Sequence, residues 1–243
     1  MSSEKSNKKV FWGVQFLILF VIIVILVILA TPSILKSRKK TAMVQAINNM
    51  KQVHLIMMDF EQDFGSFPDA NTAKMRPSLH AFTGNYSNQF LGQLIAGGYT
   101  PSEEIFFAEG GNPSGNRKPD NIIQPSNQIL QAGECGISYV LVTGGSAKIK
   151  VLRGLSSCDN GGTPYLCAPV MRGGQDAVFR PIKRAYEGRG VYMRIDGAAK
   201  YEWLDENNRI KLSGTKRSLF ETGEGTVWGS GENALVPTVL TPQ

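Results

Sequence analysis

The sequence has few of the residues from which catalytic and metal sites are usually built. Its 243 residues include two histidines, His54 and His80, and three cysteines. The cysteines have neither C-x-x-C nor Cys/His spacing, so zinc is not indicated. No G-x-S-x-G, H-E-x-x-H or phosphate-loop pattern occurs, and the glycine pairs in VTGGSAK and GEGTVWG are typical of turns. We therefore predict that the protein is not an enzyme and has no cofactor and no bound metal.

An excess of positive charge is missing from most of the chain. The formal net charge is +6, but residues 1–40 hold seven Lys/Arg and only Glu4, so the remaining residues balance. Because nucleic-acid binding depends on clustered positive charge, we expect no nucleic-acid partner. Basic residues beside an apolar segment instead suit contact with anionic lipid headgroups.

Charged residues are also missing from positions 10–35, VFWGVQFLILFVIIVILVILATPSIL. A helix of about 20 apolar residues spans a bilayer, whereas the apolar part of a signal peptide has about 7–15. Ala30-Thr31-Pro32 is not an A-x-A cleavage site, and buried helices of soluble proteins rarely run so far without a polar residue. We predict a retained transmembrane helix at 10–35, preceded by a basic cytoplasmic segment at 1–9.

An amphipathic helix is predicted at 36–63, continuing the membrane helix. Apolar residues recur there with a three-then-four spacing that forms one stripe: Met43, Ala46, Met50, Val53, Met57 and Phe60. Gln45, Asn49, Gln52, Glu61 and Gln62 lie on the opposite face. Pro32 near the junction should kink the helix, and Gly65 with Pro68 should end it.

Residues 64–243 are predicted to form one Gly-rich α+β domain. A short helix is expected at 87–96, and a loop at 110–127. ISYVLVTGG and AKIKVLRG should be neighbouring strands, and GVYMRIDGAAKYEWL should be a hairpin that turns at its Asp-Gly pair. The Gly/Pro-punctuated tail should lie over the surface or add an edge strand.

Two side-chain sets in this domain leave alternatives open. Cys158 and Cys167 enclose the turn-rich segment CDNGGTPYLC, so they can form a local disulfide if the domain is exported, or remain reduced. Asp196, Glu202, Asp205 and Glu206 lie close along the chain, but the spacing of a calcium loop is missing, so solvated turns are the simpler interpretation.

The order of these features resembles type IV pilins and the pseudopilins of type II secretion. AINNMKQ at 46–52 and DFGSFP at 63–68 resemble short motifs that follow the membrane segment in prepilin-like proteins, and DGAAK at 196–200 resembles a hairpin near their C-terminal end. The likeness covers residues 8–68 well and the rest loosely.

The resemblance implies an α+β fold in which a long N-terminal helix, transmembrane and then amphipathic, packs on a small antiparallel sheet. It also implies a single-pass protein of the bacterial inner membrane, with a cytoplasmic N-terminus and a periplasmic or extracellular domain. Its expected partners are the lipid bilayer and, through the N-terminal helix, other pilin-like subunits or secretion-machine proteins. Its expected role is structure or assembly in type II secretion or a type IV pilus-like system.

The processing signature of that family is altered here. The family has Gly before the cleavage point, Phe after it and Glu at the fifth mature position. Counting from Pro32 as the family's proline places Val10 at the glycine, Phe11 first and Gln15 at the glutamate. A register in which Gly13 is the processing glycine also departs from the signature. A neutral Gln15 can hydrogen-bond between helices but lacks the charge of a carboxylate.

Two other functions compete with assembly. A non-assembling membrane-tethered domain would use Tyr201, Trp203 and Trp228 to hold a ligand or a cell-envelope component, whereas the simpler interpretation places these aromatic residues in the core. A cytoplasm-facing membrane adaptor would need the opposite topology and reduced cysteines.

Overall fold

The structure is a computed structural model that describes residues 3–144, 151–212 and 217–243; in the first helix it describes the side chains of residues 15, 17–28 and 42–64. The chain divides into two compact units, residues 1–41 and residues 42–243. The helices are α1 (Ser3–Phe64), α2 (Thr72–Met75), α3 (Ser87–Ala96) and α4 (Lys183–Tyr186), with short 3-10 turns η1 (Pro77–Leu79), η2 (Glu104–Phe106), η3 (Ser126–Gln128) and η4 (Gly231–Asn233). The strands are β1 (Ser138–Gly144), β2 (Pro164–Ala168), β3 (Val170–Arg172), β4 (Val178–Phe179), β5 (Arg189–Arg194), β6 (Ala199–Trp203) and β7 (Leu235–Leu240).

The structure contradicts the membrane span predicted at residues 10–35. Among the described residues, no helix combines the length and the apolar character needed to cross a bilayer. The transmembrane helix at 10–35, the pilin-like fold class built on it and the single-pass location in a bacterial inner membrane are therefore wrong. Contact with a lipid bilayer, which rested on the same span, stays an untested prediction.

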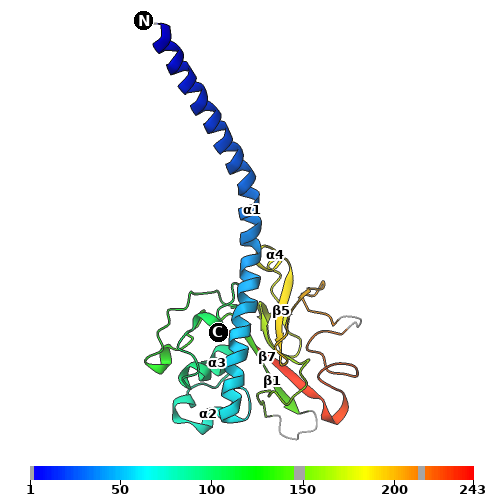
Figure 1. The fold of residues 1–243 in the computed structure, drawn as a ribbon. Coiled ribbons are helices and arrows are strands. Elements are labelled where there is room, and N and C mark those ends of the chain that lie inside the picture. Colours follow the sequence, from blue (N-terminus) through cyan, green and yellow to red (C-terminus); the bar gives the residue numbers. More distant parts are fainter. Residues whose placement is uncertain (1–2, 145–150, 213–216) are drawn as a thin grey trace. The chain divides into compact units, whose positions relative to one another are not determined.

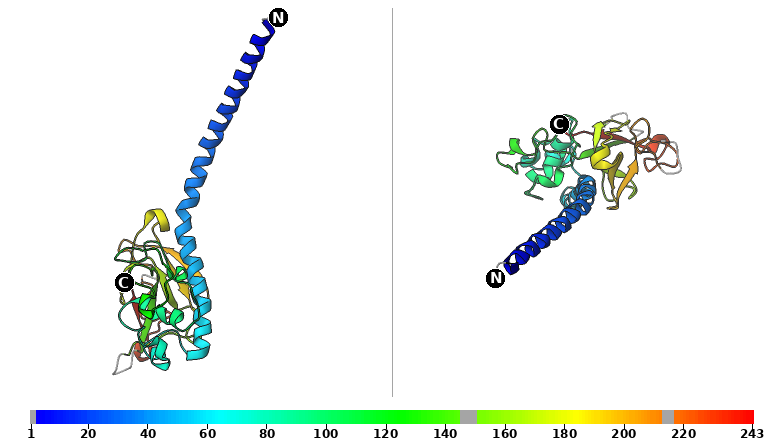
Figure 2. Two further views of the ribbon diagram at one scale, coloured as in Figure 1. Left: turned by 90° about the vertical axis from the view of Figure 1, so that its left-hand side faces the viewer. Right: turned by 90° about the horizontal axis from the view of Figure 1, so that it is seen from above.

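The C-terminal part of α1 belongs to the unit at 42–243. It lies along one side of that unit, beside both α3 and the sheet (Figures 1 and 2). The predicted apolar stripe is confirmed, because Met43 is 6% exposed and Ala46, Met50, Val53, Met57 and Phe60 are fully buried. Asn49, expected on the polar face, is also buried, and its Nδ2 donates to the carbonyls of Glu104 (3.0 Å) and Phe107 (2.8 Å). An amide is tolerated there because both of its donors are satisfied.

The end of α1 is tied to the sheet by the residues of the DFGSFPD motif. Gly65 ends the helix with φ +77°, and its N–H donates to the carbonyl of Glu61 (2.7 Å), as predicted for a glycine cap. The Phe67 N–H then donates to the carbonyl of Leu155 (2.8 Å), and the buried Tyr139 hydroxyl donates to the carbonyl of Pro68 (2.9 Å). The motif therefore joins the helix to β1 and to the segment that precedes β2.

Asp69, the last residue of the motif, links three segments. Its buried carboxylate accepts the N–H groups of Asn71 (2.6 Å) and Thr72 (2.8 Å) at the start of α2, and that of Gly154 (3.0 Å) after β1. Its carbonyl accepts the Gln93 side chain of α3 (2.8 Å). One short polar residue thus satisfies donors from distant parts of the chain, which explains how it can be buried.

The sheet is antiparallel, with the strand order β6-β5-β2-β1-β7, and β3 and β4 form a separate pair. The predicted hairpin is confirmed as β5 and β6, which turn at Gly197 (φ +77°), and the tail supplies the edge strand β7. The expected pairing of β1 with AKIKVLRG is tested only in part: residues 147–150 lie outside the described residues, and in residues 151–154 Arg153 forms an isolated antiparallel bridge with Val142 of β1. The strands that flank β1 in the sheet are β2, the next strand in sequence, and β7, the last one.

We predict that Phe60→Ala lowers the free energy of unfolding by about 3–5 kcal/mol, because it leaves a cavity beneath α1 where Phe60 stacks on Phe64 at 4.3 Å. The matched control is Leu55→Ala on the same helix, where the leucine is 65% exposed and the change should stay within about 0.5 kcal/mol. Denaturant unfolding of the two variants measures the difference. Equal losses would contradict the assignment of the buried face.

Candidate functional site

The predicted processing positions fall in the unit at residues 1–41. The side chains of Val10, Phe11, Gly13 and Pro32 lie outside the described residues, although all four positions fall within α1. Gln15 is described and exposed. The roles assigned to these positions by the resemblance therefore stay predictions.

A continuous apolar surface is the clearest candidate interaction site. Every side chain of Leu17–Ile28, which we call the apolar segment, is apolar, and their exposed fractions range from 39% to 66%. The run covers more than three helical turns, so apolar groups point in all directions around the helix. A helix that is apolar all round is normally buried, so this segment has the composition of an interface.

The cysteines are free thiols in the structure. Cys158 is exposed, whereas Cys167 is fully buried in β2, and the two are not joined. Cys135 is also buried, and burial raises its pKa to about 12. Since the thiolate is the reactive form, the two buried thiols are unsuited to nucleophilic or redox chemistry.

The three aromatic residues proposed for ligand binding do not gather in one place. Trp228 is 1% exposed, and its Nε1 donates to the carbonyl of Leu219 (2.8 Å), so it belongs to the core. Tyr201 and Trp203 are 48% and 62% exposed on β6. The guanidinium of Arg189 lies over both rings, 5.1 Å from the centroid of Tyr201 and 4.2 Å from that of Trp203. The ligand platform predicted from three aromatic residues is thus reduced to two.

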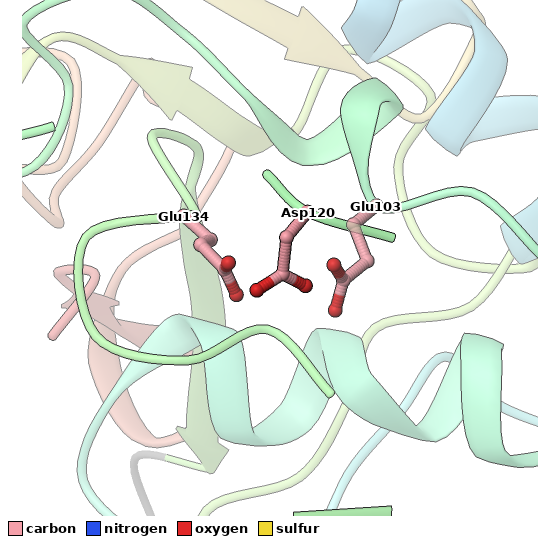
Figure 3. Close-up of side chains that lie close together, drawn as sticks. All are labelled: Glu103, Asp120 and Glu134. Carbon is pink, nitrogen blue, oxygen red and sulfur yellow. The ribbon is translucent and has the colours of Figure 1, made fainter. Parts of the chain in front are cut away.

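A cluster of carboxylates that the sequence did not predict lies among the loops after α3. Glu103, Asp120 and Glu134 each offer a carboxylate oxygen, and these oxygens lie within 4.8 Å of one another (Figure 3). Glu103 and Glu134 are fully buried and Asp120 is exposed. By geometry alone, such a group could hold a cation such as calcium.

The hydrogen bonds of the cluster favour a structural role instead. Glu103 accepts the N–H groups of Leu130 (2.7 Å) and Asn121 (2.9 Å). Glu134 accepts Arg117 (2.6 Å) and the N–H of Gln131 (2.7 Å).

The exposed member of the cluster is satisfied in the same way. Asp120 accepts the N–H of Ile122 (2.9 Å) and a longer contact from Arg117 (3.4 Å). Every carboxylate oxygen of the cluster therefore has a protein donor, and Arg117 supplies positive charge. The cluster holds together the loop at 110–134, and we propose no metal there.

The acidic residues considered for calcium at the sequence level form turns. The Asp196 carboxylate pairs with Arg194 (2.5 Å) and accepts the N–H of Ala198 (3.0 Å) within the β5–β6 turn. Asp205 accepts the N–H groups of Asn207 and Arg209, both at 2.9 Å. Both residues therefore act as turn formers, as the missing calcium-loop spacing indicated.

The histidine of α1 is a neighbour of the sheet. The His54 Nδ1 lies 2.7 Å from the hydroxyl of Tyr165, and partial burial lowers its pKa while the charge of Asp196 opposes that shift. A neutral imidazole hydrogen-bonded to a buried tyrosine is the core-edge histidine expected from its position beside Met57 and Met58.

One hollow of about 550 Å³ borders α3 and the loop at 126–132. Its apolar lining includes Phe82, Ile129 and Leu130. Asn88, also in the lining, donates to the carbonyl of Leu130 (3.0 Å) and accepts the N–H of Gln243 (3.1 Å). This amide therefore joins the lining of the hollow to the backbone of the loop and of the C-terminal residue.

Comparison with protein-family models, with curated proteins and with solved structures finds no match to this chain.

We predict that Glu103 gives the stability of the protein a pH dependence. Burial, and to a smaller extent the nearby Glu134 and Asp120, raise its pKa, while the N–H groups of Leu130 and Asn121 oppose the shift. Because the folded pKa lies above the unfolded one, this contribution is fully present below the unfolded pKa and is lost as pH rises through the folded pKa.

The measurement is denaturant unfolding of the wild type and Glu103→Gln at pH values from below the unfolded pKa of Glu103 to above its folded pKa. The stability of the wild type relative to the variant should fall as pH rises. Glu206→Gln, which changes an exposed carboxylate, is the control and should leave the pH profile unchanged. A difference that is flat or that grows with pH would contradict the interpretation.

Proposed function

We propose that this chain is a pilin-like or pseudopilin-like structural or assembly protein that works with a type II secretion or type IV pilus-like system. In this proposal the apolar segment packs against the corresponding helices of other pilin-like subunits. The single observation that carries the proposal is that Leu17–Ile28 exposes only apolar side chains.

Burial of these side chains provides the driving force for assembly. Covering a Leu, Ile, Val or Phe side chain contributes roughly 1.5–3 kcal/mol relative to leaving it in water. A run of twelve such residues supplies a large favourable term even when each partner helix covers only one face. Gln15, which precedes the run and is exposed, adds a polar group that can hydrogen-bond to a neighbouring helix.

The same helix also belongs to the globular unit. α1 runs from Ser3 to Phe64 and so includes the apolar segment. Its C-terminal turns bury one face, the stripe from Met43 to Phe60. The apolar segment and the buried stripe thus both belong to α1. The AINNMKQ and DFGSFP motifs, on which the resemblance to pilins depends, lie in this buried part and at its exit.

We predict that a photo-reactive amino acid placed at Ile22, which is 48% exposed, cross-links the chain in cells to another copy or to another pilin-like subunit. The control position is Leu55, which is 65% exposed on the same helix but lies outside the apolar segment. Mass spectrometry identifies the products. Ile22→Lys should reduce cross-linking from a neighbouring probe at Val24, because a charge in the apolar contact is costly. Labelling at Ile22 that yields no protein product would oppose the proposal.

The altered processing site gives a second prediction. Since Val10 replaces the family's Gly, we expect the wild-type chain to remain uncut when it is expressed with a prepilin peptidase. We expect Val10→Gly to yield a chain that begins at Phe11. Intact mass and N-terminal sequencing distinguish the two products, with Gly13→Ala as the control for the alternative register. A wild-type chain that already begins at Phe11 or Val14 would refute this reading of the site.

A further inference from the structure

The two edges of the five-stranded sheet differ. On the β7 edge, Gly174 and Val239 exchange backbone hydrogen bonds of 2.8 Å and 3.2 Å, and Pro237 has no N–H to offer. A proline and a covering loop are common means of preventing strand addition at an edge. The β6 edge carries neither feature within the described residues.

The backbone of β6 alternates between bonds to β5 and groups that point outward. Leu204 donates to the carbonyl of Gly188 and Arg194 donates to that of Ala198, which fixes the hydrogen-bonded positions of the hairpin. By alternation, Lys200 and Glu202 bond to β5, whereas Ala199, Tyr201 and Trp203 direct their N–H and C=O groups away from the sheet. No hydrogen bond to these three outward backbone positions is found among the described residues. Within the part of the chain that the structure describes, the edge is therefore open to another strand.

We propose that β6 pairs with β6 of a second copy of this chain, in an antiparallel arrangement about a two-fold axis at Tyr201. In this register Tyr201 lies opposite Tyr201 of the second copy, and Ala199 lies opposite Trp203. All of these residues have outward-pointing backbone groups, so each pair can exchange its N–H···O hydrogen bonds. The five-stranded sheet would become a continuous sheet of ten strands across two copies.

Charge complementarity identifies a second copy as the partner. The two-fold register places Lys200 of each copy opposite Glu202 of the other, which produces two opposite-charge cross-strand pairs. Both side chains are exposed, and neither forms an ion pair within the described chain. Lys and Glu on an edge strand normally discourage pairing, but the sequence K-Y-E is complementary to its own antiparallel copy.

The aromatic rings of β6 fit the same arrangement. Arg189 stacks on Tyr201 and Trp203 and so holds both rings against one face of the sheet. At the symmetry axis the two Tyr201 rings become a cross-strand aromatic pair, and each Trp203 faces the small side chain of Ala199, which leaves space for the indole. This inference does not depend on the proposed assembly through α1.

The first test exchanges the charges in the full-length chain, kept in one mild detergent throughout. Lys200→Glu and Glu202→Lys each convert both attractive pairs into repulsive ones, so each should weaken self-association about tenfold. The double variant and an equimolar mixture of the two single variants restore opposite charges, and both should recover the wild-type affinity. Sedimentation equilibrium measures the dissociation constants. Single variants that associate like the wild type, or a mixture that fails to recover, would overturn the proposal.

A second test fixes the register in a Cys158→Ser background, which removes the exposed native thiol. Tyr201→Cys brings two sulfurs together at the axis, where hydrogen-bonded partners have Cα atoms about 5.5 Å apart and a disulfide can form. Trp203→Cys is the control, since its two copies would be about 14 Å apart along the strands. Mild oxidation should give a covalent dimer with Tyr201→Cys alone. Equal cross-linking at both positions, or none at position 201, would refute the two-fold register.

Discussion

The packing of α1 on the sheet is the contact on which the rest of the globular unit depends. Met50, Val53, Met57 and Phe60 are fully buried in the same core as the strands, and the buried residues of α3 belong to that core as well. A small sheet in a domain of this size cannot bury both of its faces by itself, so a helix laid along it supplies the missing apolar layer. Asn49 helps to fix the position of α1 in this contact, because its amide donates to the carbonyls of Glu104 in η2 and of Phe107 just after it.

The sequence predicted the parts of the fold that depend on local periodicity. The buried stripe of α1 followed from the spacing of residues at 43–60, the β5–β6 hairpin from its alternation and Asp-Gly turn, and the cap at Gly65 from glycine chemistry. The pairing of β1 with β7, almost a hundred residues later in the chain, could not be predicted from local periodicity. The predicted membrane span is contradicted because, among the described residues, no helix is both long and apolar enough to cross a bilayer.

The candidate sites were harder to predict than the fold. Glu103, Asp120 and Glu134 meet only because a loop without periodicity folds back beside α3, so no spacing in the sequence marks them. Their role also depends on Arg117 and on backbone N–H groups, which a sequence motif does not reveal. Tyr201, Trp203 and Trp228 show the same limit, since residues of one chemical type were grouped by composition but only two of them are exposed. The alternating K-Y-E of β6 was visible as a pattern, yet its importance depends on which strand lies at the edge.

Asp69 has a consequence for how this unit folds. Its carboxylate bridges the start of α2 and Gly154, which lies 85 positions further along the chain, and its carbonyl receives Gln93 from α3. None of these segments can satisfy its polar groups alone, and a buried carboxylate with only some of its partners is costly. The helix exit, α3 and the connection between β1 and β2 should therefore become ordered together. Contacts between residues so far apart in sequence make folding slow compared with a helical bundle of the same length.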